Sequence, residues 1–215
     1  MKVIGIAGAI GVGKSSVARA LVSDAGLARD LGGAVHYFNA DDALRSARNQ
    51  AGPLQDAILK LLPAAQGPDG SLNQAALASA AFSDPTLLKQ LELLQWPVAR
   101  AAMHVARDQA VAGGASLLLV EAIALLNSGL AEELDGYLVL TLPTSERRER
   151  AIGRGMGGAA FEERDAAQHG LTEALLAAGG VEVSARGSVQ EVAAEAGRAL
   201  RLLCSTDEPH PDPAT

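Results

Sequence analysis

The chain carries, at residues 3–15, the stretch VIGIAGAIGVGKS. Its first five residues are an apolar run with the length and composition of a buried strand. Glycines follow, and from residue 15 to residue 21 apolar residues recur at helical spacing. The stretch therefore predicts a strand, a glycine-rich loop and a helix, in that order.

Residues 8–15 of this stretch fit the pattern G-x-x-x-x-G-K-[ST], which binds phosphate when it lies between a strand and a helix. Glycines let the backbone wrap around a phosphate, so that N–H groups and the start of the helix face the anion. Lys14 is expected to reach the β- and γ-phosphates, and Ser15 to hold Mg²⁺. The alternative, a glycine-rich turn with an incidental lysine, is disfavoured because the strand before it and the helix after it are those that a phosphate loop requires. The predicted nucleotide-binding residues are Gly8, Gly11, Gly13, Lys14, Ser15 and Ser16.

Four further apolar runs predict the rest of a sheet. Each is bounded by glycine or acidic residues, and helix-length segments separate them. This alternation predicts an α/β fold, with a parallel five-stranded sheet and helices on both faces. The four runs lie at residues 34–38, 117–121, 136–142 and 181–183.

The predicted organisation is one domain, over residues 1–203, that carries the phosphate loop. About 75 residues without a convincing strand imply a helical insertion at about 48–112, suited to holding a substrate. The segment 145–168 is rich in Arg and Glu around a glycine-rich centre, and it predicts a mobile helical hairpin acting as a lid. Three prolines and few apolar residues predict a disordered tail at 204–215.

The charge and composition of the chain disfavour some classes of binding partner. The net charge of -7 and the 3% aromatic content disfavour binding to nucleic acid or to an anionic membrane surface. Cys204 is the only cysteine, so a disulfide within the chain is excluded and a cytoplasmic location is expected. The apolar runs are too short to span a bilayer.

The motif set favours a small-molecule kinase. The sequence lacks the N-K-x-D motif of guanine-reading switches and the L-S-G-G-Q-like signature of transporter ATPases. ATP is the expected phosphoryl donor, with an acceptor held by the helical insertion and a lid that closes over the phosphates.

An acidic pair follows the second predicted strand, at Asp41 and Asp42. This position is the carboxyl edge of the sheet, where ligands of open α/β folds bind. One of the two could orient, or take the proton of, an acceptor hydroxyl. The alternative is that one of them caps a helix predicted at 43–47.

Three more side chains are candidates for phosphate and metal chemistry. Glu121 ends an apolar strand, where an acid meets Mg²⁺ through water in phosphate-loop enzymes; a solvent-exposed strand end is the alternative. Arg150 and Arg154 are four residues apart on the lid and would share a helix face. Their planar forks suit a transferring phosphoryl group, and a solvated helix face is the alternative.

Several segments, in order over residues 1–203, resemble the dephospho-coenzyme A kinase family. The opening stretch resembles its phosphate loop, and NADDALR resembles its D-A-D-x-L-A-R segment, with Asp41 at the second acid. Further similar segments are FSDP, LELLQWPVAR and LLLVEAIALLNSGL.

The resemblance implies transfer of the γ-phosphate of ATP to the 3′-hydroxyl of dephospho-coenzyme A, the last step of coenzyme A biosynthesis. With Lys14 of the phosphate loop, it implies Asp41, Arg150 and Arg154 as catalytic residues, and it implies Arg45, Trp96 and Arg100 as acceptor-binding residues. From the residues alone, Trp96 is better explained as a core anchor than as a stacking partner.

The chain departs from the family pattern mainly on the acceptor side. Two alternatives therefore stay open: a kinase for another hydroxyl acceptor, such as a nucleoside or a pantothenate-like molecule, and a weakly active, nucleotide-binding regulatory paralogue. The departures are Asn39, Asn73, Gln74, Trp96, Glu121, Ile123, Ala124, Asn127 and Ala185.

Overall fold

The computed structural model describes residues 1–122, 125–126 and 128–205. The chain divides into two compact units. The first joins Met1–Phe38 to the chain from Arg107 onward, and the second is Asn39–Ala106. The first unit contains the sheet, and the second is helical.

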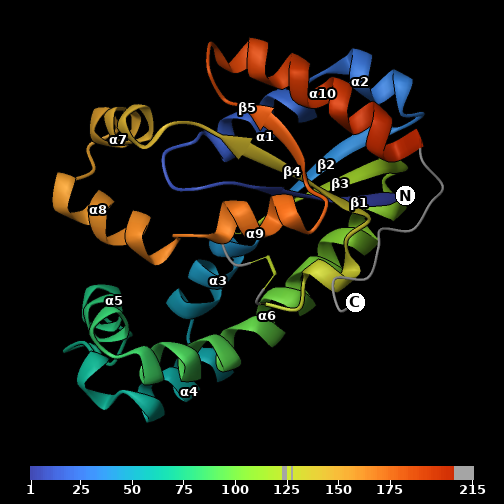
Figure 1. Ribbon diagram of the computed structural model, residues 1–215. Coiled ribbons are helices and arrows are strands. Elements are labelled where there is room, and N and C mark those ends of the chain that lie inside the picture. The colour runs from blue at the N-terminus through green and yellow to red at the C-terminus, as the bar shows by residue number, and fades with distance from the viewer. Residues whose placement is uncertain (123–124, 127, 206–215) are drawn as a thin grey trace. The chain divides into compact units, whose positions relative to one another are not determined.

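The sheet of the first unit is five-stranded, in the order β2-β3-β1-β4-β5 (Figure 1). β1 lies at its centre and pairs in parallel with β3 and β4, and β4 pairs in parallel with β5. The predicted α/β class and parallel sheet are confirmed. The strands are β1 (Lys2–Ala7), β2 (Ala34–Asn39), β3 (Ala115–Glu121), β4 (Gly136–Thr141) and β5 (Val181–Ser184).

Helices α1 (Lys14–Val22), α2 (Ala25–Asp30) and α10 (Val189–Ser205) cover one face of this sheet (Figure 1). Alternate strand residues point toward them, because side chains of a strand alternate between its two faces. Burying this face in a single apolar core is what holds the phosphate-loop end of β1 against α1. The core residues include Ile4, Ile6, Leu119, Leu138 and Leu140 from the strands and Val17, Leu21, Leu27, Val192 and Leu200 from the helices.

Helix α9 (Leu171–Ala177) packs against β4 on the opposite face. Because Gly180 has no side chain, α9 can lie this close to β4. A Cβ there would lie 2.6 Å from Cγ2 of Val139 and 2.8 Å from the carbonyl oxygen of Leu175.

The predicted lid segment forms two helices, α7 (Thr144–Gly153) and α8 (Gly158–Ala167). The turn between them includes Gly155 at a φ of 89°, which an L side chain rarely adopts. The helical hairpin is therefore confirmed. Its mobility stays a prediction.

The second unit is built from α3 (Ala40–Asn49), α4 (Pro53–Leu61), α5 (Gln74–Ser83) and most of α6 (Pro85–Ala112), which continues into the first unit. Pro97 lies inside α6 without interrupting it. The unit has its own small core, as a helical insertion requires. Its buried residues are Leu54, Ile58, Ala65, Leu72, Leu77 and Leu91.

The C-terminal helix α10 extends into the segment predicted as a tail. Cys204 and Ser205 belong to α10 and not to a disordered tail, because Leu203 and Cys204 still pack against the main core. Residues 206–215 of the predicted tail lie outside the described residues. No helix in the described part of the chain has the length and apolarity that a membrane span requires.

Candidate active site

Two glycines shape the phosphate loop, residues 8–15. Gly8 has a φ of 140° and Gly11 a φ of 82°, both in the region that favours glycine. A Cβ on Gly8 would lie 2.4 Å from the carbonyl oxygen of Leu140, and one on Gly11 would lie 2.4 Å from that of Arg147. The loop thus depends on glycine for its conformation and for its close contact with β4 and α7.

Helix α1 begins at the end of the loop, with Gly13 as its N-cap and no side chain capping it. Such a helix start presents N–H groups and a positive dipole end to an anion. Lys14, the first residue of the helix, is buried, and its Nζ donates a hydrogen bond of 2.8 Å to the carbonyl oxygen of Gly8. A positive charge is therefore held against the loop backbone.

Glu121, at the end of β3, joins the loop to β2. Its Oε1 accepts a hydrogen bond of 3.0 Å from Oγ of Ser15, and its Oε2 accepts one of 2.5 Å from the phenol of Tyr37. Glu121 is only 5% exposed, so the alternative of a solvent-exposed strand end is wrong. Tyr37 carries no sequence signal of this role, because an aromatic residue in a strand is ordinary.

Ser15 and Glu121 suit a Mg²⁺ ion whose other ligands are phosphate and water, rather than an ion enclosed by protein ligands alone. Hydroxyl and carboxylate oxygens suit this hard cation, which usually keeps several waters and binds through one or two protein ligands plus phosphate. Among the described residues, no group of three or more His, Cys, Asp or Glu could hold a metal ion.

Arg150 bridges the loop to the turn after β5. Its Nη1 donates to the carbonyl oxygen of Val12 at 3.1 Å and its Nη2 to that of Ala185 at 2.9 Å. Arg154 is the C-cap residue directly after α7 and lines the same hollow, of about 320 Å³. The two arginines thus line one hollow, and their contact with phosphate stays a prediction. Gly13, Ser16, Gly187, Ser188 and Val189 also line it.

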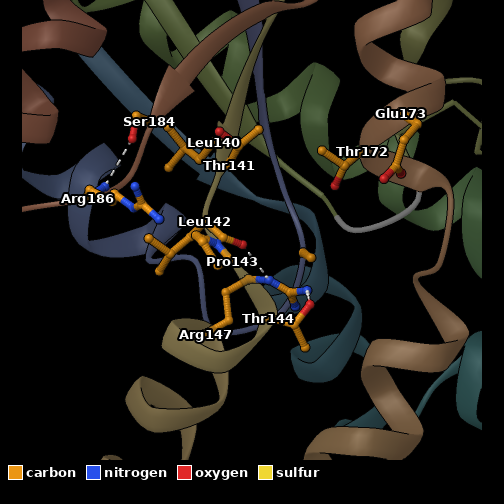
Figure 2. A pocket seen from close by; sticks show the side chains of 11 residues that line it. Leu140, Thr141, Leu142, Pro143, Thr144, Arg147, Thr172, Glu173, Ser184 and Arg186 are labelled. Atoms are coloured by element: carbon orange, nitrogen blue, oxygen red, sulfur yellow. Dashed lines mark hydrogen bonds between the residues drawn. The ribbon is translucent and has the colours of Figure 1, made fainter.

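Arg147 is the buried arginine of the lid. It donates to the carbonyl oxygens of Leu142 (3.0 Å) and Ile10 (3.2 Å), to Oγ1 of Thr144 (2.8 Å) and to the carboxylate of Asp165. Figure 2 shows Arg147 pointing toward Leu142 and Thr144. The side chain therefore fastens α7 and α8 to the phosphate loop.

Gln168, directly after α8, completes this attachment: its Oε1 accepts a hydrogen bond of 2.7 Å from the N–H of Ile10. Both backbone groups of Ile10 are thus bound by side chains of the lid segment. Gln168 is the last residue of the predicted lid segment, but the sequence did not indicate this contact.

A second hollow, of about 380 Å³, lies beside the loop at the carboxyl ends of β4 and β5 (Figure 2). Arg147 and Arg186 bring positive charge to it, and Glu173 brings negative charge from α9. The remaining lining is Ala9, Leu140, Thr141, Leu142, Pro143, Thr144, Thr172 and Ser184.

In the second unit, Asp41 and Asp42 lie in the first turn of α3, which begins at Ala40 and not at residue 43. The cap is Asn39, whose Oδ1 accepts a hydrogen bond of 3.0 Å from the N–H of Asp42. The alternative that an aspartate caps this helix is therefore wrong, because the helix starts earlier. Asp42 instead pairs with Arg45 at 2.8 Å.

Besides Asn39, two further departures from the family pattern have structural roles in this unit. Asn73 caps α5 by accepting hydrogen bonds of 3.1 Å from the N–H groups of Ala75 and Ala76. Gln74 accepts a hydrogen bond of 3.2 Å from Nε of Arg48.

The predicted site residues divide between the two units. The first unit brings together Gly8, Gly11, Gly13, Lys14, Ser15, Ser16, Glu121, Arg150 and Arg154. The second contains Asp41, Arg45, Trp96 and Arg100. Trp96 and Arg100 are partly buried on α6. The departures Ile123, Ala124 and Asn127 lie outside the described residues.

A parallel sheet of this strand order, with a phosphate loop between its central strand and α1, is the architecture of a phosphate-loop kinase. The described site has the parts of that class, namely a buried loop lysine, a serine paired with a strand-end acid, and lid arginines.

Within this class, the chain belongs to the dephospho-CoA kinase family, whose model matches residues 2–184. It is 33% identical over 205 residues to a dephospho-CoA kinase of Anaeromyxobacter dehalogenans, covering 94% of this chain and 92% of that one. A dephospho-CoA kinase of Aquifex aeolicus is 28% identical, covering 89% and 92%.

Solved structures agree on the fold. A Thermus thermophilus protein designated TT1252 superposes with a TM-score of 0.73 at 28% identity, covering 95% of this chain and 98% of that one. A dephospho-CoA kinase from Campylobacter jejuni superposes with a TM-score of 0.59 at 17% identity, covering 94% and 98%.

Proposed function

We propose that this chain transfers the γ-phosphate of ATP to the 3′-hydroxyl of dephospho-coenzyme A, the last step of coenzyme A biosynthesis. The observation that carries the proposal is the complete phosphate loop, with its Ser15 and Glu121 pair, in a chain that the family model matches over residues 2–184. The kinase class follows from the family, and the roles of individual residues are our proposal.

The phosphate loop binds the triphosphate in this proposal. Its backbone and the uncapped start of α1 receive the phosphates, and Lys14 reaches the β- and γ-phosphates. Burial of Lys14 supports this role, because an ammonium at the loop in a low-dielectric site interacts strongly with an anion.

Ser15 and Glu121 would hold Mg²⁺, the serine directly and the glutamate through water. The ion, when bound, neutralises phosphate charge and fixes the phosphate geometry. Tyr37 supports the assignment, because its hydrogen bond orients the Glu121 carboxylate while Ser15 keeps that carboxylate beside the loop.

Arg150 and Arg154 stabilise the charge of the transferring phosphoryl group in this proposal, and the hollow that they line takes the rest of the nucleotide. The support is the position of Arg150 between the loop carbonyl of Val12 and the turn after β5. A guanidinium held on two sides needs little rearrangement during transfer.

Asp41 orients the acceptor hydroxyl and takes its proton, and Arg45, Trp96 and Arg100 bind the acceptor. The support is that Asp41 sits in the first turn of α3 in register with the family's acid, and that Asn39 performs the capping. The carboxylate of Asp41 is thereby not required as the helix cap.

We also propose a cytoplasmic location. The single thiol of Cys204 is a free cysteine, and a chain without a disulfide fits a reducing compartment.

The test compares acceptors at fixed ATP. We expect kcat/KM for dephospho-coenzyme A to exceed that for adenosine, uridine and pantothenate by at least about 100-fold, because a site built to hydrogen-bond its substrate rejects analogues strongly. The product should carry its new phosphate on the 3′-oxygen. A higher kcat/KM with any of the other three would refute the proposed acceptor.

A further inference from the structure

Arg48 of α3 is fastened between two other helices of the second unit. Its Nε donates a hydrogen bond of 3.2 Å to Oε1 of Gln74 on α5, and its Nη1 donates to Oε1 of Gln95 on α6. The guanidinium is partly buried among these three helices.

The two glutamines are themselves oriented. Nε2 of Gln74 donates to Oδ1 of Asn49 at 3.0 Å, and Nε2 of Gln95 donates to the carbonyl oxygen of Leu91 at 3.1 Å. With their NH₂ groups occupied in this way, both amides present their oxygens to Arg48. The arrangement is a built cradle for one guanidinium.

The cradle leaves the charge of Arg48 without a matching hydrogen-bonded anion. Both side-chain acceptors of its guanidinium in the described part of the chain are neutral amide oxygens. Arg45, by contrast, pairs with the carboxylate of Asp42. Burial, and then the positive charge of Arg45, lower the pKa of Arg48, while the charge of Asp41 opposes this. Arginine nevertheless stays protonated in proteins, so a fixed positive charge is present here.

A partly buried cation whose hydrogen-bond partners are all neutral is costly, the nearby charge of Asp41 offsets only part of that cost, and a ligand anion would offset more of it. A guanidinium has five N–H donors, and the two glutamine contacts use two of them. The remaining donors suit phosphate oxygens, which planar forks bind well.

Asp41, Arg45 and Arg48 follow one another at the spacing i, i+4, i+7, so they share one face of α3. Seven residues of helix span about 10 Å. The side chains of Asp41 and Arg48 can lean toward each other, so their polar ends can lie closer together than that. In dephospho-coenzyme A the 3′-hydroxyl and the 5′-diphosphate are attached to the same ribose. A helix face that orients the hydroxyl can therefore also carry the cation for the diphosphate.

We propose that Arg48 binds the diphosphate of the acceptor, with Gln74 and Gln95 as positioning residues that hold its guanidinium. The inference rests on the proposed function for the identity of the acceptor. It adds a binding residue that neither the phosphate-loop motif nor the family resemblance indicated.

The experiment compares Arg48→Gln with Lys60→Gln, which removes an exposed cation of the same unit. A charge-assisted hydrogen bond contributes enough that its loss should weaken dephospho-coenzyme A binding about 10- to 100-fold, measured by calorimetry and as KM. The KM for ATP and the binding of adenosine, which has no phosphate, should change less than about twofold. Lys60→Gln should leave all three unchanged.

A purely structural role for Arg48 predicts a different result. The melting temperature would fall, while the affinities for dephospho-coenzyme A and adenosine would either stay unchanged or fall together, and either outcome overturns the proposal. If Arg48→Gln does not fold, Gln95→Leu is the deciding variant. It keeps the charge of Arg48 but removes one of the two amides that hold its guanidinium. Severalfold weaker binding of dephospho-coenzyme A, with adenosine unaffected, supports the proposal, and unchanged binding refutes it.

The same measurements separate this inference from the proposed function. If the wild-type chain binds dephospho-coenzyme A without phosphorylating it, the proposed function fails, and the loss of binding in Arg48→Gln still supports the diphosphate contact. If the wild-type chain phosphorylates it and Arg48→Gln does so with the same KM, only the inference fails. No binding to the wild-type chain refutes both.

Discussion

The phenol of Tyr37, on β2, donates a hydrogen bond of 2.5 Å to Oε2 of Glu121 at the end of β3, while Ser15 of the phosphate loop donates to Oε1 at 3.0 Å. Each oxygen of one buried carboxylate thus has its own donor. Glutamate is one methylene longer than the aspartate of the family pattern, and therefore has one more rotatable bond to restrict. Tyr37 supplies that restriction from the neighbouring strand.

Tyr37→Phe should therefore impair use of Mg²⁺ without unfolding the protein. Removing one donor to a buried charge costs about 1–3 kcal/mol, so the Mg²⁺ concentration for half-maximal activity should rise about 10-fold. Calorimetry of Mg²⁺ with ATP on the variant should show the same weakening. Tyr137→Phe, which removes a phenol bonded to the carbonyl oxygen of Ala131, is the matched control. Equal Mg²⁺ dependence in wild type and Tyr37→Phe would contradict the positioning role.

Lys14→Ala should lower phosphoryl transfer by at least about 100-fold, because the preorganised charge that meets the β- and γ-phosphates is lost. The Nζ of Lys14 donates to the carbonyl oxygen of Gly8, and the main core consists of apolar side chains that the variant keeps, so the far-ultraviolet circular dichroism should be unchanged. Lys60→Ala should keep full activity. A folded Lys14→Ala variant with wild-type turnover would disprove the role of the phosphate loop.

Asp41→Asn should lower kcat by about 100-fold or more, because removing a general base typically costs 10²- to 10⁴-fold. ATP binding should be largely retained. Asp42→Asn is the matched control: Asp42 pairs with the exposed Arg45, and such surface pairs contribute about 0–1 kcal/mol. A larger loss of kcat in Asp42→Asn than in Asp41→Asn would mean that the neighbouring acid does the chemistry.

Gln168→Leu should loosen the phosphate loop from the lid. The N–H of Ile10 loses its 2.7 Å partner, and a hydrogen bond of this kind contributes about 1 kcal/mol net, so the KM for ATP should rise about fivefold. Hydrogen exchange at Ile10 should accelerate. Exchange at Ile10 that is identical in the variant and the wild type would show that this bond does not hold the loop.

In the wild-type protein, we predict that the segment 145–168 closes over the phosphates, so its hydrogen exchange should slow when ATP and acceptor are added together. Exchange that does not slow would contradict the closure.

Gly11→Ala should damage the loop through both of its constraints. The new Cβ would lie 2.4 Å from the carbonyl oxygen of Arg147, and the φ of 82° is strained for alanine. Strain at one such position costs about 1–3 kcal/mol, so the melting temperature and the affinity for ATP should both fall. Gly153→Ala, with no atom within 4 Å of the added Cβ, should be neutral. A Gly11→Ala variant with unchanged ATP affinity would show that the loop tolerates the clash.

Residues that are contiguous in the sequence were sufficient to predict the class of fold. Strand, glycines, Lys14 and Ser15 are contiguous, so their order alone predicts a phosphate loop, and alternating strands and helices predict the parallel sheet. The helical hairpin of α7 and α8 was also predictable, because its arginines and glycines lie in one segment. The sequence did not reveal that α3 begins at Ala40, since an asparagine cap and an aspartate cap look alike in a sequence.

Tertiary structure alone decided the contacts between distant residues. Tyr37 meets Glu121 across 84 positions, Arg147 meets Ile10 across 137, and Arg48 meets Gln95 across 47. No spacing rule connects such residues, because sheet order and helix packing determine which side chains meet. The sequence by itself therefore determined which chemical groups this protein has, and the packing of its two cores determined which of them are held together.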